Sequence, residues 1–230
     1  MRSISKLFFA GLALSAAPTA SGCDSTLDVV LASSGGPDAG FDNFGKDFDI
    51  LRALVLLTGL EGSLGKPGDG GLTDITVFAP WDDAFFRLAK QLSDFVDDDA
   101  NEFNPSGYDE EGAFSYIAGV LTELAGGTEE GLKELVTNIL LYHVADEAIV
   151  FRRLAEKGHK KTTVTTLFEG NEIPIVMAMP TSQNSMRMKM KHNAAGSEFR
   201  FPKIQNKQFD IKTCNGRLNV IKDVLIPLEV

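Results

Sequence analysis

The side chains that could do acid–base or metal chemistry are few and scattered in this sequence. The chain of 230 residues has three histidines, His143, His159 and His192, which lie far apart. No Gly-x-Ser-x-Gly, His-Glu-x-x-His or Cys-x-x-Cys motif occurs. A phosphate-binding loop ending at Gly65 would need a glycine where the chain has Leu60. We therefore expect no enzyme, no cofactor and no metal site.

One acidic run invites a calcium-binding interpretation. Asp97, Asp99 and Asn101 match the first three ligand positions of a helix-loop-helix calcium loop. Position six of that loop requires glycine but is Glu102, and position twelve requires glutamate but is Tyr108. We therefore interpret residues 97–102 as a solvated charge run.

A basic segment with strict alternation lies in the C-terminal third. In Met186–Lys191, a strand would place three methionines on one face and Arg187, Lys189 and Lys191 on the other. Cations on one face would repeat every ~6.6–7 Å, which suits an anionic polysaccharide. The alternative is an ordinary half-buried strand with a solvated face.

Charge is divided unevenly along the chain. The net charge is −10, and an acidic protein is repelled by phosphate backbones, which argues against nucleic acid as a partner. Residues 1–150 carry 8 Lys and Arg against 25 Asp and Glu, whereas residues 151–230 carry 14 against 7. This asymmetry indicates either two differently charged surfaces of one domain or a basic face that binds an acidic polymer.

The N-terminal segment has the layout of a signal peptide over residues 1–22. Arg2 and Lys6 precede the apolar run Leu7–Ala17, and small residues follow up to Gly22. We expect a secreted, extracellular protein. Two alternatives are an uncleaved N-terminal anchor and, in a bacterium, a lipid tether at Cys23, although the usual leucine of a lipoprotein box is missing.

The chain has two cysteines, Cys23 and Cys214. In an oxidising compartment an even pair indicates one disulfide, which would close most of the mature chain into a loop. The alternatives are two unpaired thiols, or a lipidated Cys23 beside a free Cys214.

Periodicity predicts helices early in the chain and strands late, which favours an α+β fold in one domain. Expected helices cover residues 24–32, 44–60, 84–92 (capped by Asp82), 113–124 and 132–142, with a short strand and a helical turn in 147–157. Expected strands cover residues 75–79, 162–167, 173–177, 186–191, 208–211 and 217–225. The glycine-rich segment 59–71 is expected to be a loop.

Three ordered blocks resemble the conserved blocks of fasciclin-like domains. They are Thr76–Phe85 (Thr-Val-Phe-Ala-Pro, then Ala-Phe), Leu140–Val144 (Leu-Leu-Tyr-His-Val) and Asn215–Pro227 (Asn-Gly, then Val-Ile and Val-Leu-Ile-Pro). Thr165-Thr166-Leu167 resembles a further short element of the family. The resemblance covers residues 24–230 as one domain, with a helical and acidic insertion at about 94–127. Trp81 and Asn219 depart from the family pattern, where Thr or Ser and His are usual.

The resemblance implies helices packed on a C-terminal wedge of short, mostly antiparallel strands. It also implies a non-catalytic module for extracellular adhesion, which binds a matrix component, a cell-surface receptor or an anionic polysaccharide, with weak self-association as a further option. Two short elements of some relatives are linked to integrin binding. One corresponds to Tyr142 and His143 in this chain, and the other corresponds to Asp210 and Ile211. For both pairs a structural role is the alternative. A secreted carrier or sensor of a small apolar ligand is the alternative function.

Overall fold

A computed structural model gives the structure of residues 22–96, 102–159, 161–168, 172–178, 187–190, 203–204 and 208–227. The signal peptide predicted for residues 1–22 falls outside these described residues except for Gly22. In the part of the chain that the structure describes, every helix is too short or too polar to cross a bilayer.

The helices begin where polar side chains can bind their first amides. Ser25 and Asp28 form a reciprocal capping box at α1, and Asp109 and Thr128 accept hydrogen bonds at the starts of α5 and α6. Gly59 ends α2 in the left-handed conformation. The α-helices are α1 (Thr26–Ser33), α2 (Asp49–Thr58), α3 (Glu61–Leu64), α4 (Asp82–Val96), α5 (Glu110–Leu124), α6 (Glu129–Tyr142) and α7 (Phe151–Glu156), and the 3-10 helix η1 covers Pro67–Asp69.

The strands form two sheets. One has the order β2–β1–β7–β6, and its central pair β1–β7 is parallel. The other has the order β3–β4–β5 and is antiparallel throughout. The strands are β1 (Ile75–Pro80), β2 (Val144–Ala145), β3 (Lys161–Thr165), β4 (Glu172–Ala178), β5 (Arg187–Met190), β6 (Ile211–Lys212) and β7 (Gly216–Ile221).

The α+β prediction is confirmed, and most pairings are antiparallel as expected. Several local predictions are wrong. Of the strand expected at residues 208–211, only Ile211 lies in a strand, β6. Residues 59–71 contain α3 and η1 in place of a continuous loop, and residues 147–150 form no strand because the short strand lies earlier, at Val144–Ala145.

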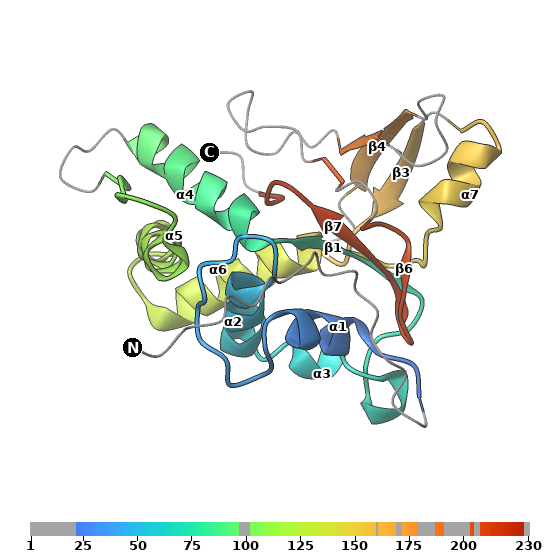
Figure 1. Cartoon of the computed structure of the whole chain (residues 1–230), viewed down its shortest axis with the longest axis horizontal. Coiled ribbons are helices and arrows are strands. Elements are labelled where there is room, and N and C mark those ends of the chain that lie inside the picture. The colour runs from blue at the N-terminus through green and yellow to red at the C-terminus, as the bar shows by residue number, and fades with distance from the viewer. Residues whose placement is uncertain are drawn as a thin grey trace, which may run out of the picture.

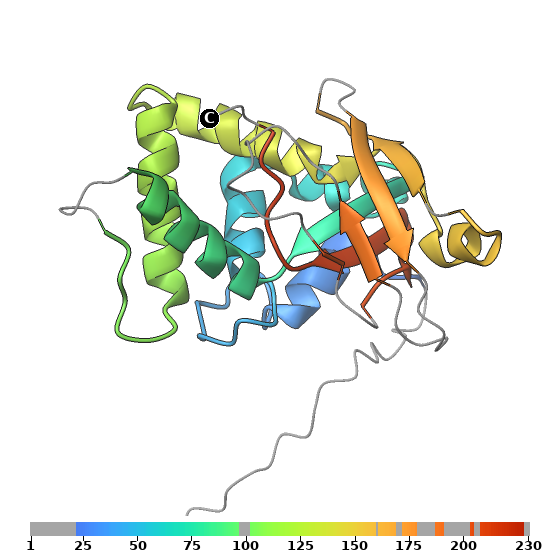
Figure 2. The same ribbon diagram turned by 90° about the horizontal axis from the view of Figure 1, so that it is seen from above.

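The central sheet separates two apolar cores. Val77 and Leu218 face a core made with helices α1 to α6, whereas Phe78 and Ile221 face a second core made with α7 and the β3–β4 region. Every residue of β1 is therefore buried, as expected for a strand covered on both faces. The views agree that α4 and α5 lie at one end of the molecule and α7 with the second sheet at the other (Figures 1 and 2).

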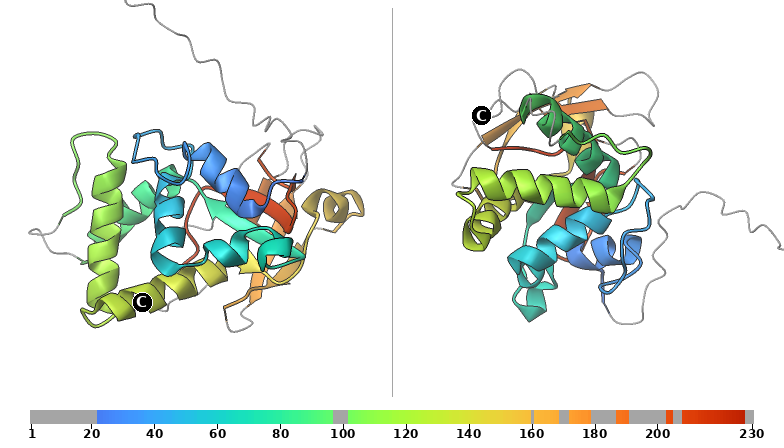
Figure 3. Two further views of the ribbon diagram at one scale, coloured as in Figure 1. Left: turned by 90° about the horizontal axis from the view of Figure 1, so that it is seen from below. Right: turned by 90° about the vertical axis from the view of Figure 1, so that its left-hand side faces the viewer.

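The predicted insertion at about 94–127 is part of this architecture where the structure describes it. Helix α5 contributes Ala113, Ile117 and Leu121 to the first core, together with Leu88 of α4. Figure 3 shows α5 packed beside α4 and α6. The described portion of the insertion is therefore a core element.

The three sequence blocks meet at β1. Val77 pairs with Val144 on one side and with Leu218 on the other. In addition, the Phe78 amide donates to the His143 carbonyl at 2.8 Å. The blocks therefore build one assembly from segments as far apart in the chain as Val77 and Leu218, which are separated by 141 positions.

Asn215 and Gly216 fix the start of β7. The buried Asn215 side chain accepts from the Thr26 amide at 3.0 Å and donates to the Leu64 carbonyl at 3.0 Å, so it joins α1 and α3 to β7. Gly216 has φ 153°, and a Cβ there would lie 1.8 Å from the Ile75 carbonyl oxygen. Only glycine allows β1 to approach this closely.

Candidate functional site

Tyr142 and His143 lie inside the molecule at the end of α6. They are 4% and 3% exposed. His143 Nδ1 lies 2.7 Å from the Ile139 carbonyl, so it donates there, and Nε2 accepts from the Leu225 amide at 3.0 Å. This arrangement requires a neutral ring protonated on Nδ1. The pair therefore joins α6 to the C-terminal segment, and a role in receptor contact stays a prediction that requires local opening.

Asp210 caps a helix. Its two carboxylate oxygens accept from the Phe151 and Arg152 amides at 2.9 and 2.8 Å, at the start of α7. The Asp210 amide donates to Asn219 Oδ1 at 2.8 Å, which supports its left-handed backbone at φ 54°. Ile211 is half-buried against the first core. The adhesion role of this pair also stays a prediction.

The basic strand is placed in part. The backbone of Arg187 pairs with Ala178, and that of Lys189 pairs with Val176, at the edge of the second sheet. Lys191 lies outside the described residues. The strand is therefore confirmed at residues 187–190, and its polyanion role stays a prediction.

A second group of cations surrounds the turn at Phe209 and Asp210. The Arg152 guanidinium lies 5.3 Å from the Phe209 ring centroid, and Arg217 Nη1 donates to the Asp210 carbonyl at 3.4 Å. Lys212 is exposed and pairs across the strands with Arg217. We call Arg152, Phe209, Lys212 and Arg217 the turn patch.

Sequence reasoning did not find the turn patch because its members span residues 152–217. The excess of cations in residues 151–230 was the signal that pointed to this part of the chain. Within the patch, both oxygens of Asp210 are bound by amides, so this carboxylate is already satisfied. Cations and an aromatic ring are the groups that contact anionic sugars.

Cys23 and Cys214 form a disulfide with a Cα–Cα distance of 5.2 Å. The Cys214 amide also donates to the Asp24 carbonyl at 2.7 Å. The disulfide prediction is confirmed. A lipid on Cys23 would need the same sulfur atom and therefore stays an alternative to this bond. A disulfide is typical of chains from oxidising compartments, in agreement with a secreted protein.

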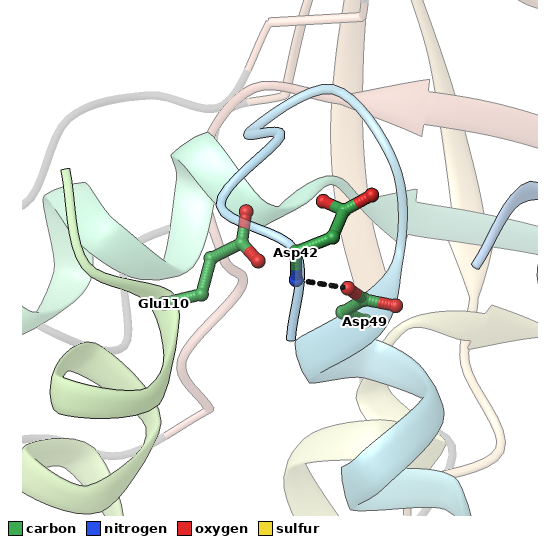
Figure 4. A group of neighbouring side chains, drawn as sticks. All are labelled: Asp42, Asp49 and Glu110. Atoms are coloured by element: carbon green, nitrogen blue, oxygen red, sulfur yellow. Dashed lines mark hydrogen bonds between the residues drawn. The ribbon is translucent and has the colours of Figure 1, made fainter. Parts of the chain in front are cut away.

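An acidic cluster forms where the loop before α2 meets the first turns of α4 and α5. Figure 4 shows Asp42, Asp49 and Glu110 directed toward one another from the loop, α2 and α5. One carboxylate oxygen of each lies within 4.8 Å of the others, and the same holds for the trio of Asp47, Asp82 and Glu110. Asp47, Asp49, Asp82 and Glu110 are at most 6% exposed.

Asp82 has a different partner from the one predicted. Its carboxylate accepts from the Asp49 and Ile50 amides, each at 2.9 Å, and thus caps α2. The prediction that Asp82 caps its own helix is wrong because the loop before α2 folds against the start of α4. Main-chain bonds hold it there, including one from the Asp83 amide to the Gly45 carbonyl at 2.9 Å.

Burial dominates the electrostatics of the cluster. It raises the pKa of Glu110 to about 7 and the pKa values of Asp47 and Asp82 above their usual range, and neighbouring carboxylates add to the effect. Among the described residues, no Lys, Arg or His lies within ion-pair distance of these three. Sequence reasoning missed the cluster because its members are spread over residues 42–110 and each is an ordinary acid in its local context.

Two apolar cavities bear on the carrier alternative. One, of about 30 Å³, lies between α1, α2 and the end of α6, and the other, of about 20 Å³, lies between α4, α5 and α6. Each has room for one or two water molecules. Neither could hold a small apolar ligand without rearrangement, so these cavities give the carrier function no support.

Comparisons with known proteins complete the description. No family model matches the chain, and no curated protein matches it. Eleven chains of solved structures match. One belongs to a FAS1 domain pair from the insect cell adhesion molecule fasciclin I, at 15% sequence identity and a TM-score of 0.44. The match covers 76% of this chain and 45% of that chain, so this chain spans less than half of its length. The α+β fold is established by the elements and pairings above, and the likeness to fasciclin-like domains stays a resemblance.

Proposed function

We propose that this chain is an extracellular adhesion module that binds an acidic polymer of its surroundings through the turn patch. The clustering of Arg152, Lys212 and Arg217 around one turn is the observation that supports the site most directly. The resemblance of three sequence blocks to adhesion domains and the Cys23–Cys214 disulfide support the extracellular setting.

The turn patch has the chemistry of a polyanion contact. Arg152 is exposed on α7, and its guanidinium is positioned beside the Phe209 ring, so less side-chain freedom is lost on binding. Lys212 and Arg217 carry two further charges across a strand pair. The acidic helices α4 and α5 lie at the opposite end of the molecule (Figure 1). A polyanion would therefore approach the α7 end.

Binding to a resin that carries a sulfated or uronic-acid polysaccharide tests the proposal. The double variant Arg152→Gln with Lys212→Gln removes two positive charges from the patch. At ~0.5 kcal/mol for each exposed ion contact, affinity should fall about fivefold, and the protein should elute at lower salt.

The matched control is Lys90→Gln with Lys133→Gln, which removes two exposed charges from α4 and α6. The control should elute with the wild type. If the wild type is not retained at moderate salt, or if both double variants lose retention equally, the turn patch is not the binding site.

A further inference from the structure

Asp47 and Glu110 each bury an oxygen without a protein partner. Asp47 Oδ1 and Glu110 Oε1 have no hydrogen-bond donor, although the residues are 6% and 0% exposed. The second oxygen of Glu110 is used, because it accepts from the Asn43 amide at 2.8 Å. A buried carboxylate oxygen left without a donor or a cation is strongly destabilising. Asp47 and Asp82 also share a side-chain hydrogen bond, which needs a proton on one of the two carboxyls. A cation in place of that proton would bind these carboxylates and would also meet the two oxygens that lack a donor.

The third member of the trio fixes the geometry. Asp82 is fully buried, and the Asp49 and Ile50 amides hold its carboxylate in place. One oxygen each of Asp47, Asp82 and Glu110 lie within 4.8 Å of one another. Ligands of one calcium ion at 2.3–2.6 Å can be up to ~5 Å apart, so a single ion can contact all three.

We propose that Asp47, Asp82 and Glu110 bind a divalent cation of the calcium type. All three offer oxygen ligands, which hard cations prefer over the nitrogen and sulfur ligands of zinc sites. Calcium accepts irregular sets of six to eight oxygens, whereas magnesium demands a near-ideal octahedron at 2.0–2.1 Å. Carboxylates contributed by a loop and two helix starts suit the more tolerant ion.

The neighbouring trio of Asp42, Asp49 and Glu110 is the less suitable site. Arg52 Nη1 lies 3.4 Å from Asp49 Oδ1, so a guanidinium already compensates part of that charge and would repel a second cation. The charges of Asp47 and Asp82 have no such partner among the described residues. Glu110 belongs to both trios, and the exposed Asp42 marks the side from which an ion can enter.

A bound cation would connect three segments. It would tie the loop before α2 to the first turns of α4 and α5, and the Tyr108 ring, which contacts Phe86 with centroids 4.8 Å apart, packs beside this junction. With three carboxylate ligands and the remaining positions left to other oxygens, we expect a dissociation constant of ~10⁻⁴–10⁻³ M, the range of extracellular calcium modules.

Terbium luminescence and thermal unfolding test the site in the full-length oxidised protein. Trp81 is the only tryptophan and precedes the ligand Asp82, so it can sensitise Tb³⁺ bound there. We expect sensitised emission that CaCl₂ competes away. CaCl₂ at 10 mM should raise the melting temperature by about 3–8 °C relative to EDTA at matched ionic strength.

Glu110→Gln and Asp47→Asn should abolish both responses, and the control Glu111→Gln, an exposed neighbour on the same helical turn, should keep them. In EDTA both variants should melt at or above the wild-type temperature, because each replaces a carboxyl group whose charged form is disfavoured by burial. A wild type without emission, or variants that respond as the wild type does, would overturn the site. A larger shift with MgCl₂ than with CaCl₂ would overturn the choice of calcium. The polysaccharide assay is independent of these outcomes.

Discussion

Replacing Asn215 with alanine should be the most damaging single change to a polar side chain. The side chain accepts hydrogen bonds at 3.0 Å from the Thr26 amide, the Thr26 hydroxyl and the Thr213 hydroxyl, and it donates to the Leu64 carbonyl. The two hydroxyls lie 3.3 Å apart and can bind each other after the change. The Thr26 amide and the Leu64 carbonyl would remain buried and unpaired.

Each unpaired group costs about 1–3 kcal/mol, so Asn215→Ala should lower the free energy of unfolding by about 4 kcal/mol. For a domain of this size, that corresponds to a fall in melting temperature of about 8–16 °C. Guanidinium denaturation measures the change, and a thiol assay should verify that the disulfide is intact in both proteins. Asn104→Ala, at an exposed loop position, is the control and should change stability by less than 0.5 kcal/mol.

A loss below 1 kcal/mol with an unchanged denaturant slope would refute the reasoning. It would mean that water or a local shift satisfies the two main-chain groups after the amide is removed. The interpretation of Asn215 as the connection between α1, α3 and β7 would then be wrong.

Three further changes have expected outcomes. Reducing the Cys23–Cys214 disulfide, or replacing both cysteines with serine, should lower the free energy of unfolding by about 5 kcal/mol. In the chain-entropy model the loss is this large because the bond joins residues with a sequence separation of 191. Chemical denaturation with and without reductant measures the change in stability. Gly216→Ala should destabilise the fold by more than about 3 kcal/mol, because the new Cβ would collide with the Ile75 carbonyl, and both soluble yield and melting temperature should fall. The control Gly107→Ala should have little effect, because a Cβ at position 107 would have no atom within 4 Å. Asp210→Ala removes the cap of α7 and should cost about 1 kcal/mol of stability. Retention on the polysaccharide resin should not fall, because the change removes a negative charge from the turn patch. A loss of cell adhesion without a loss of stability would favour the receptor role.

Local patterns predicted most elements because those elements follow local rules. Phe85, Leu88 and Leu92 recur on one face of α4, and this periodicity predicted the helix. The short helix α3 escaped prediction because Gly62 and Gly65 lie in or beside it, and glycine is a poor helix former. It forms through tertiary contact, since Leu64 is buried in the first core.

Long-range relations could not be predicted from periodicity. The parallel pairing of β1 with β7 joins Ile75 to Gly216, and spacing alone does not reveal which strands become neighbours. The same limit applies to the acidic cluster, since Asp47 and Glu110 meet only after α2, α4 and α5 have packed. The roles of His143 and Asp210 in adhesion stay predictions; within the fold, both side chains form hydrogen bonds.

The Cys23–Cys214 bond has a mechanical consequence for the proposed adhesion function. A pulling force that enters before residue 23 and leaves after residue 214 passes through the covalent bridge and bypasses residues 24–213 between them. Those residues would otherwise extend by ~650 Å when unravelled. With the bridge intact, the elements from α1 to β6 are shielded from tension because they lie between the two cysteines. Strand β7 follows Cys214 and stays in the path of the force, so the module could lengthen only through the segment that follows the bridge. In a reducing environment the same module would become extensible.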